Sequence, residues 1–179
     1  MTWRSIIKGK ARKILTQFYN IGKHRSDAEN QSEAQMLIRG AVFLRDGVNA
    51  EGSTNNMAHP ALAALITDFF YAPSSLSITF PEVFSREVPK VAVCLAATAL
   101  HATLDEYTQT STHQDRPFEY IGYSRVFAGF LDMQHQLDSV PKHASKMKAL
   151  RITWATSSSI LSKSGPLVAF SDEFGVVLD

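Results

Sequence analysis

The residues whose types and spacing could support chemistry lie near the middle of the chain. His101 and Asp105 are four positions apart, so on a helix they share one face, and Glu106 follows one step further round. A histidine beside a carboxylate can transfer protons or ligate a metal ion. His113 lies in the polar stretch that follows and could fold back onto His101. We take these four as candidate catalytic residues, although a surface hydrogen-bonding pair is the commoner meaning of such spacing.

The remaining reactive groups offer little support for an enzyme. Cys94 is the single cysteine, and it lies in the most apolar stretch of the chain, where we expect an inert core thiol. One cysteine excludes an internal disulfide framework, a cysteine zinc site and an iron–sulfur cluster. No phosphate-binding glycine loop, dinucleotide fingerprint or nucleophile elbow is present. We therefore expect no cofactor and no metal site.

Charge is segregated along the chain, although the net charge is only +1. Residues 1–25 carry +7, residues 26–139 carry −8, residues 140–163 carry +5 and residues 164–179 carry −3. Basic segments of this kind can bind nucleic acid or an acidic protein, whereas the commoner outcome is that they pair with the acidic body of the same domain. The candidate binding residues lie in the two basic segments: Arg4, Lys8, Lys10, Arg12, Lys13, Lys146 and Arg151.

Apolar residues recur every three or four positions along most of the chain, which is typical of helices packed on a core. This spacing predicts helices over residues 3–19, 27–45, 60–71 and 89–107, with further helices after Pro117 and Pro141. The stretch 89–107 is apolar nearly all round and should be the central, buried helix. A polar loop is expected between Asp46 and Met57.

The fold class that follows is all-α, a single globular bundle of about six to seven helices. The sequence contains no alternating strand pattern and no internal repeat. Its 45% apolar residues are enough to form a hydrophobic core. We assign residues 1–161 to the helical domain and 162–179 to a loosely structured C-terminal tail. No run of 18 apolar residues is present, so no membrane span is expected. The amphipathic first helix could dock on the core, lie on a membrane or target an organelle.

The central part of the chain resembles the domain of unknown function 6532 (DUF6532), a family found in mushroom-forming fungi. The segments that carry the resemblance are residues 59–62, 66–71, 80–84, 89–100 and 104–107, and the helix with Tyr123, Phe127 and Leu131. The resemblance covers roughly residues 4–155, and its motifs are mostly apolar and helical. It implies that the first helix belongs to the domain rather than to a targeting segment. It transfers no activity and no catalytic residues.

Two main hypotheses of function remain. The first is a non-enzymatic helical interaction module that binds an acidic partner, nucleic acid or protein, through the basic N- and C-terminal helices. The alternative is an enzyme or small-molecule-binding protein with a bundle pocket near His101, Asp105 and Glu106. Attachment to a membrane surface through the first helix is a third, weaker hypothesis. The chain has 11 Phe, 5 Tyr and 2 Trp residues, and aromatic side chains left exposed on the surface would favour self-association. As a separate prediction, we expect an intracellular protein, cytoplasmic or nuclear.

Overall fold

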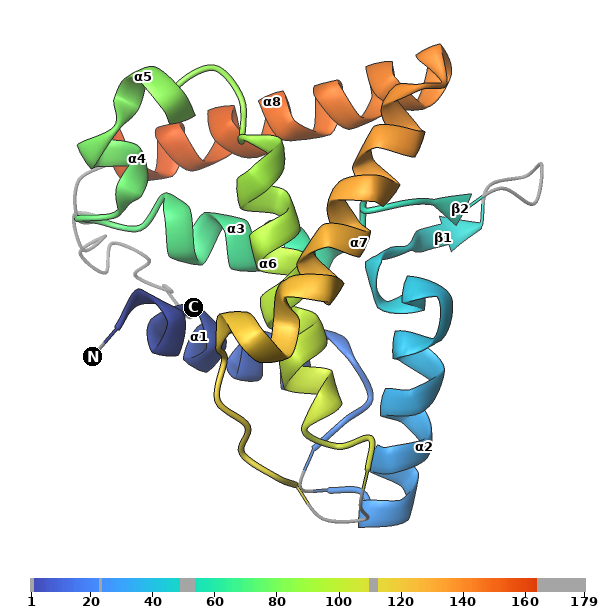
Figure 1. The fold of residues 1–179 in the computed structure, drawn as a ribbon. Coiled ribbons are helices and arrows are strands. Elements are labelled where there is room, and N and C mark those ends of the chain that lie inside the picture. The colour runs from blue at the N-terminus through green and yellow to red at the C-terminus, as the bar shows by residue number, and fades with distance from the viewer. Residues whose placement is uncertain (1, 23, 49–53, 110–112, 164–179) are drawn as a thin grey trace, which may run out of the picture.

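The computed structural model describes residues 2–22, 24–48, 54–109 and 113–163, and this part of the chain is mostly helical (Figure 1). The prediction of an all-α fold is therefore confirmed. The elements in chain order are α1 (Trp3–Phe18), α2 (Asp27–Ile38), the 3-10 helix η1 (Arg39–Leu44), β1 (Asp46–Val48), β2 (Thr54–Asn55), α3 (Pro60–Phe70), α4 (Leu76–Thr79), α5 (Pro81–Phe84), α6 (Lys90–Asp105), α7 (Tyr120–Asp138) and α8 (Pro141–Lys163).

Helix α6 lies at the centre of the molecule, as its lack of a polar face predicts. It packs against α1, α2, α3 and α7, while α8 contacts α3 and α7 and runs along the top of the view (Figure 1). Its buried residues include Cys94, and burial raises the pKa of this thiol to about 11. Every element that carries a candidate site residue therefore contacts α6 or a neighbour of α6.

Helix α1 docks on the core, which confirms the first of the three predicted roles of this segment. Ile7, Ala11, Ile14 and Leu15 form its buried stripe. Trp3 and Phe18, near the two ends of the helix, remain 49% and 40% exposed. Among the described residues, no helix is both long enough and apolar enough to cross a membrane.

Local sequence signals fix several helix starts. The Ser26 hydroxyl accepts the backbone N–H of Glu29, and the Glu29 carboxylate accepts the backbone N–H of Ser26, which is a complete capping box at the start of α2. The His59 ring accepts the backbone N–H of Ala61, and Pro60 occupies the first turn of α3. These contacts satisfy backbone groups that a helix end would otherwise leave without partners.

Two details differ from the sequence expectation. The single helix predicted over residues 27–45 breaks after Ile38, because Gly40 and Ala41 adopt left-handed backbone angles with φ of 65° and 54°. The loop predicted between Asp46 and Met57 contains the short antiparallel pair β1–β2, with Asp46 opposite Asn55. Two paired strands of three and two residues are too short to show an alternating pattern in the sequence.

The predicted boundary between domain and tail at residue 161 falls inside a helix. Helix α8 continues to Lys163, so it includes the first two residues assigned to the tail. The remainder of that segment, residues 164–179, lies outside the described residues.

Candidate functional site

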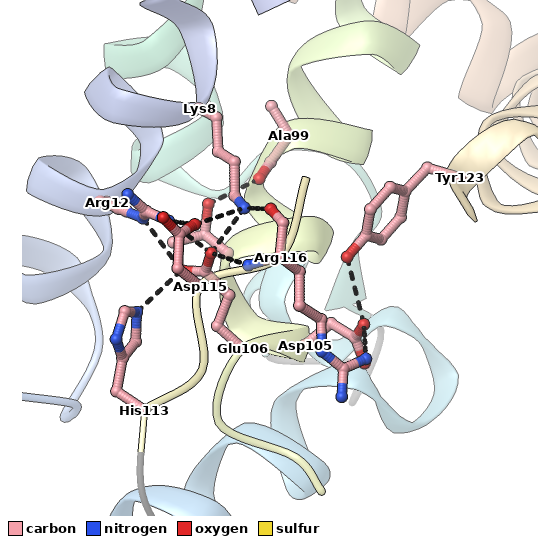
Figure 2. Close-up of polar contacts among 10 residues, drawn as sticks. Lys8, Arg12, Ala99, Asp105, Glu106, His113, Asp115, Arg116 and Tyr123 are labelled. Carbon is pink, nitrogen blue, oxygen red and sulfur yellow. Dashed lines mark hydrogen bonds and ion pairs between the residues drawn. The ribbon is translucent and has the colours of Figure 1, made fainter. Parts of the chain in front are cut away.

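The buried Glu106 carboxylate is the centre of a cluster of charged groups (Figure 2). Lys8 Nζ lies 2.5 Å from Oε1, and the side chains of Lys8 and Glu106 are 6% and 0% exposed. Arg12 binds the same carboxylate through both ends of its guanidinium, with Nη2 2.6 Å from Oε1 and Nε 3.0 Å from Oε2. Both cations project from α1, and Glu106 directly follows the last residue of α6. The cluster thus fixes α1 against the C-terminal end of α6.

The segment that follows α6 folds back over this cluster. His113 Nε2 lies 3.0 Å from Glu106 Oε2, and the backbone N–H of Arg116 donates to Oε1 at 3.2 Å. Asp115 pairs with both Lys8 and Arg12, and Lys8 also donates to the backbone carbonyl of Arg116. Figure 2 shows Asp115 and Arg116 lying beside the α1 cations, with His113 below them. Three separate parts of the chain therefore meet at one carboxylate.

The electrostatics of the cluster keep Glu106 ionised. Burial alone would raise the pKa of Glu106, but hydrogen bonds from Arg12, Lys8, the Arg116 backbone and His113 outweigh burial and lower that pKa to about 2. The pKa of Arg12 is raised in turn by its hydrogen bond to Glu106. Both oxygens of Glu106 already accept hydrogen bonds. A carboxylate in this state is suited to holding helices together and poorly suited to exchanging protons with a substrate.

Asp105 lies next to this cluster and connects α6 to α7. Arg116 Nη1 lies 2.7 Å from Asp105 Oδ2, and the Tyr123 hydroxyl donates to the same oxygen at 3.2 Å. The Thr108 hydroxyl donates to the other oxygen, Oδ1, at 3.0 Å. Burial, with a further contribution from Asp105, raises the pKa of Tyr123 to about 12, so this phenol stays protonated and continues to donate.

His101 occupies a different environment from the other candidate catalytic residues. Its ring packs edge-on against Phe43, Phe130 and Tyr123, with centroid distances of 6.2, 6.2 and 6.5 Å. Burial lowers the pKa of His101, and its Nδ1 atom is buried without a hydrogen-bond partner among the described residues. No hydrogen bond joins His101 to Asp105 in this part of the chain. The structure brings His113 to Glu106 rather than to His101.

The basic residues of the N-terminal segment are largely paired within the fold. Lys8 and Arg12 bind Glu106, Lys10 lies 2.7 Å from Asp68, and the Arg4 guanidinium lies 5.4 Å from the centre of the Trp3 ring. Lys13 is exposed. In the C-terminal basic segment, Arg151 is buried and its Nη2 lies 3.0 Å from Glu87. Of the seven candidate binding residues, four therefore neutralise carboxylates of the same chain.

The exposed cations of α8 are arranged differently. Lys142, Lys146 and Lys148 are exposed, and none of them forms an ion pair with another described residue. Lys142 and Lys148 were not among the predicted binding residues. The sequence could have indicated them, because residues 140–163 contain no Asp or Glu that could pair with them locally. Lys142 and Lys146 are four residues apart and so share one face of the helix.

A groove of about 390 Å³ runs between α8 and the β1–β2 hairpin. Leu137, Met147 and Leu150 supply apolar surface, and His143 and Lys146 line it from α8. The wall on the hairpin side includes these polar residues: Asp46, Asn55 and Asn56. The groove therefore combines apolar surface with one lysine, Lys146, at its α8 edge and one acidic residue, Asp46, on its hairpin wall. Within the described ranges, no three His, Cys, Asp or Glu side chains are placed to hold a metal ion.

The fold and the Glu106 cluster define a helical domain in which ion pairs within the chain join α1 to the end of α6. The chain belongs to the family described as domain of unknown function (DUF6532), whose model matches residues 1–137. This confirms the resemblance, although the match ends before α8 and is shorter than the expected span of residues 4–155. No curated protein and no solved structure matches the chain.

Proposed function

We propose that this protein is a non-enzymatic interaction module that binds an acidic partner through the exposed face of α8. The observation that carries the proposal is the contrast between the two basic segments. Three of the five cations of α1 form ion pairs within the chain: Lys8, Lys10 and Arg12. The exposed lysines of α8 form none among the described residues. Cations left without intramolecular partners attract anionic ligands most strongly.

The groove beside α8 indicates what kind of acidic partner would fit. Leu137, Met147 and Leu150 offer apolar contacts, and Lys146 and His143 lie next to them. An acidic protein segment with interspersed apolar side chains matches both features, because its apolar groups can enter the groove while a carboxylate contacts Lys146.

Nucleic acid matches the same surface less well. Affinity for nucleic acid comes mainly from many phosphate contacts, and three exposed lysines offer few. The isoelectric point of about 7.9 is also below the range typical of nucleic-acid-binding domains. Among the described residues, the exposed aromatic side chains lie outside α8: Trp3, Phe18, Phe80 and Tyr120.

The proposal is tested with a fluorescein-labelled peptide of alternating Glu and Leu residues and with a random DNA duplex, each titrated into the full chain over a salt series. Lys146→Glu should weaken peptide binding by about tenfold or more, since it reverses a charge at the groove. Lys13→Glu is the matched control, because Lys13 is an exposed cation on α1 and the charge change is identical.

Peptide binding should also weaken as salt rises, because exposed charges are screened within about 10 Å at 0.1 M salt. Equal effects of Lys146→Glu and Lys13→Glu would overturn the assignment to α8, as would peptide binding that does not respond to salt. DNA binding that is stronger than peptide binding and lost in Lys146→Glu would keep the surface but identify nucleic acid as the partner.

A further inference from the structure

The chain itself contains a segment with the chemistry expected of a partner for the α8 groove. Residues 164–179 follow α8 directly and lie outside the described residues. They carry no basic side chain and three acidic ones, Asp172, Glu173 and Asp179, and Phe170 and Phe174 flank the first two. We propose, as an inference that rests on the proposed function of α8, that residues 164–179 bind in the groove of the same chain. An external acidic partner must then displace them.

Charge complementarity is the first support for this assignment. Lys142, Lys146 and Lys148 are exposed on α8, and none of them forms an ion pair within the described part of the chain. The three acids of residues 164–179 carry an equal and opposite charge. Because Asp46 lies on the hairpin wall of the groove, the acids of a bound segment are expected to face α8, where Lys146 lines the groove.

The apolar surface of the groove is the second support. Its lining includes three large apolar side chains: Leu137, Met147 and Leu150. Its volume of about 390 Å³ lies within the range of roughly 300–1,000 Å³ for sites that enclose a small molecule, so an aromatic side chain fits. Phe170 and Phe174 stand on either side of two adjacent acids in the sequence. One ring can therefore enter the groove while a neighbouring carboxylate contacts Lys146.

The lengths involved allow residues 164–179 to reach back to the groove. The groove residues of α8 recur every three or four positions and so follow one face of the helix: His143, Lys146, Met147, Leu150 and Thr153. Lys146 lies 17 residues before Lys163, the last residue of α8, which is roughly 26 Å along an α-helix. The ten residues that lead from Lys163 to Glu173 span up to about 33 Å when extended. Gly165 and Pro166 form a dipeptide typical of turns, which suits a chain that reverses direction after α8.

The same chain is favoured over a second copy as the source of the segment. A binding segment joined to its site by a short tether has an effective concentration on the order of 1 mM. Only ten residues lead from Lys163 to Glu173, so the tether is short. A second copy of this 19.8 kDa chain would match that concentration only at about 20 mg/mL. At the protein concentrations of an ordinary binding titration, the tethered segment therefore fills the groove first.

Carbodiimide cross-linking of the wild-type chain tests the contact directly, because this reagent joins a carboxylate to an amine only when the two groups touch. Digestion and mass spectrometry should find Lys146 joined to Asp172 or Glu173. Lys13, an exposed lysine on α1, is the control amine and should show far fewer cross-links to these acids. In an equal mixture of nitrogen-15-labelled and unlabelled protein, each cross-linked product should carry a single isotope, because both groups belong to one molecule.

Competition measures the consequence for binding. Asp172→Lys/Glu173→Lys reverses two charges of the segment, and Asp132→Lys/Glu82→Lys makes the identical changes at exposed positions of α7 and α5. The first variant should bind the labelled peptide of alternating Glu and Leu residues about threefold or more tightly than the second, because it loses a tethered competitor. Lys146→Glu weakens the segment as well as the peptide. Its full effect on the peptide, about tenfold, is therefore expected in the Asp172→Lys/Glu173→Lys background, and the effect in the wild type should be smaller.

Three results would overturn this inference. These are cross-links from Lys13 to residues 164–179 as frequent as those from Lys146, equal peptide binding by the two double variants, and cross-linked products that carry both isotopes. If the peptide still binds in a way that depends on Lys146, these results leave the α8 proposal standing. Conversely, cross-links to Lys146 without any peptide binding by Asp172→Lys/Glu173→Lys would support this inference and refute the external partner.

Discussion

Replacing Glu106 with glutamine should destabilise the fold strongly. The substitution keeps the size of the side chain and removes its charge. Lys8 would then remain buried beside a neutral amide, and Arg12 would lose the carboxylate that both ends of its guanidinium contact. Asp115 could compensate only in part, because its side chain is 73% exposed and its contact with Lys8 is 3.4 Å long.

Two independent considerations give the magnitude of this effect. Removing one partner of a buried ion pair typically costs roughly 3–5 kcal/mol. The lowering of the Glu106 pKa from 4.5 to about 2 leads to a similar value, on the order of 3 kcal/mol, because one pKa unit is worth about 1.4 kcal/mol. For a domain of this size, that loss should lower the melting temperature by about 6–12 °C.

Urea unfolding followed by far-ultraviolet circular dichroism measures the effect, with Asp68→Asn as the control. Asp68 pairs with Lys10 at 2.7 Å, but the Asp68 side chain is 50% exposed. Surface pairs of this kind contribute less than about 1 kcal/mol. The difference between the two variants therefore isolates the effect of burying the charge.

The pH dependence gives a second, stricter check on the same reasoning. The folded-state pKa of Glu106 is lowered, so its ionised form stabilises the fold fully above pH 4.5 and progressively less as the pH falls towards about 2. The stability difference between the wild type and Glu106→Gln should shrink over that interval. A Glu106→Gln protein as stable as Asp68→Asn at pH 7, or a difference that stays constant down to pH 3, would refute the interpretation of the cluster.

Two further predictions concern other parts of the molecule. Arg151 is buried beside Glu87, and two of its nitrogens lack hydrogen bonds among the described residues. In urea titrations, Arg151→Met should therefore leave the free energy of unfolding unchanged or raise it, because it removes a poorly satisfied buried charge. Glu87→Gln should lower the free energy of unfolding, because it leaves that charge without its partner. Self-association remains a prediction, and the exposed apolar surface at Ile121 (90% exposed) and Tyr120 (74% exposed) is the place to test it. Ile121→Glu should lower the mass measured by light scattering at high protein concentration if that surface is the interface.

Much of the fold could be predicted from the sequence because helix formation depends on neighbouring residues. The spacing of apolar side chains identified α1, α3, α6, α7 and α8, and proline positions marked several of their starts. The central place of α6 followed from its lack of a polar face. The break at Gly40 and Ala41 was missed, because the apolar spacing continues through it and only the folded chain shows two left-handed residues in succession.

The candidate site could be predicted only in its parts. The sequence grouped His101, Asp105 and Glu106 and suggested that His113 folds back onto His101. The structure instead brings His113 to Glu106, at the C-terminal end of α6. The sequence did not indicate that Arg12 binds Glu106, since 94 residues separate them along the chain. Nor did the sequence distinguish His101, which lies one turn from Asp105 yet packs among aromatic rings.

The sequence by itself thus determined the helices, their order and the segregation of charge into two basic segments. Tertiary structure alone decided which of those charges are paired. Lys8 and Lys146 are both lysines in basic helical segments, but packing places Lys8 against a buried carboxylate and leaves Lys146 in solvent. The reason is that burial and ion pairing depend on contacts between distant segments, which form only when the helices pack together.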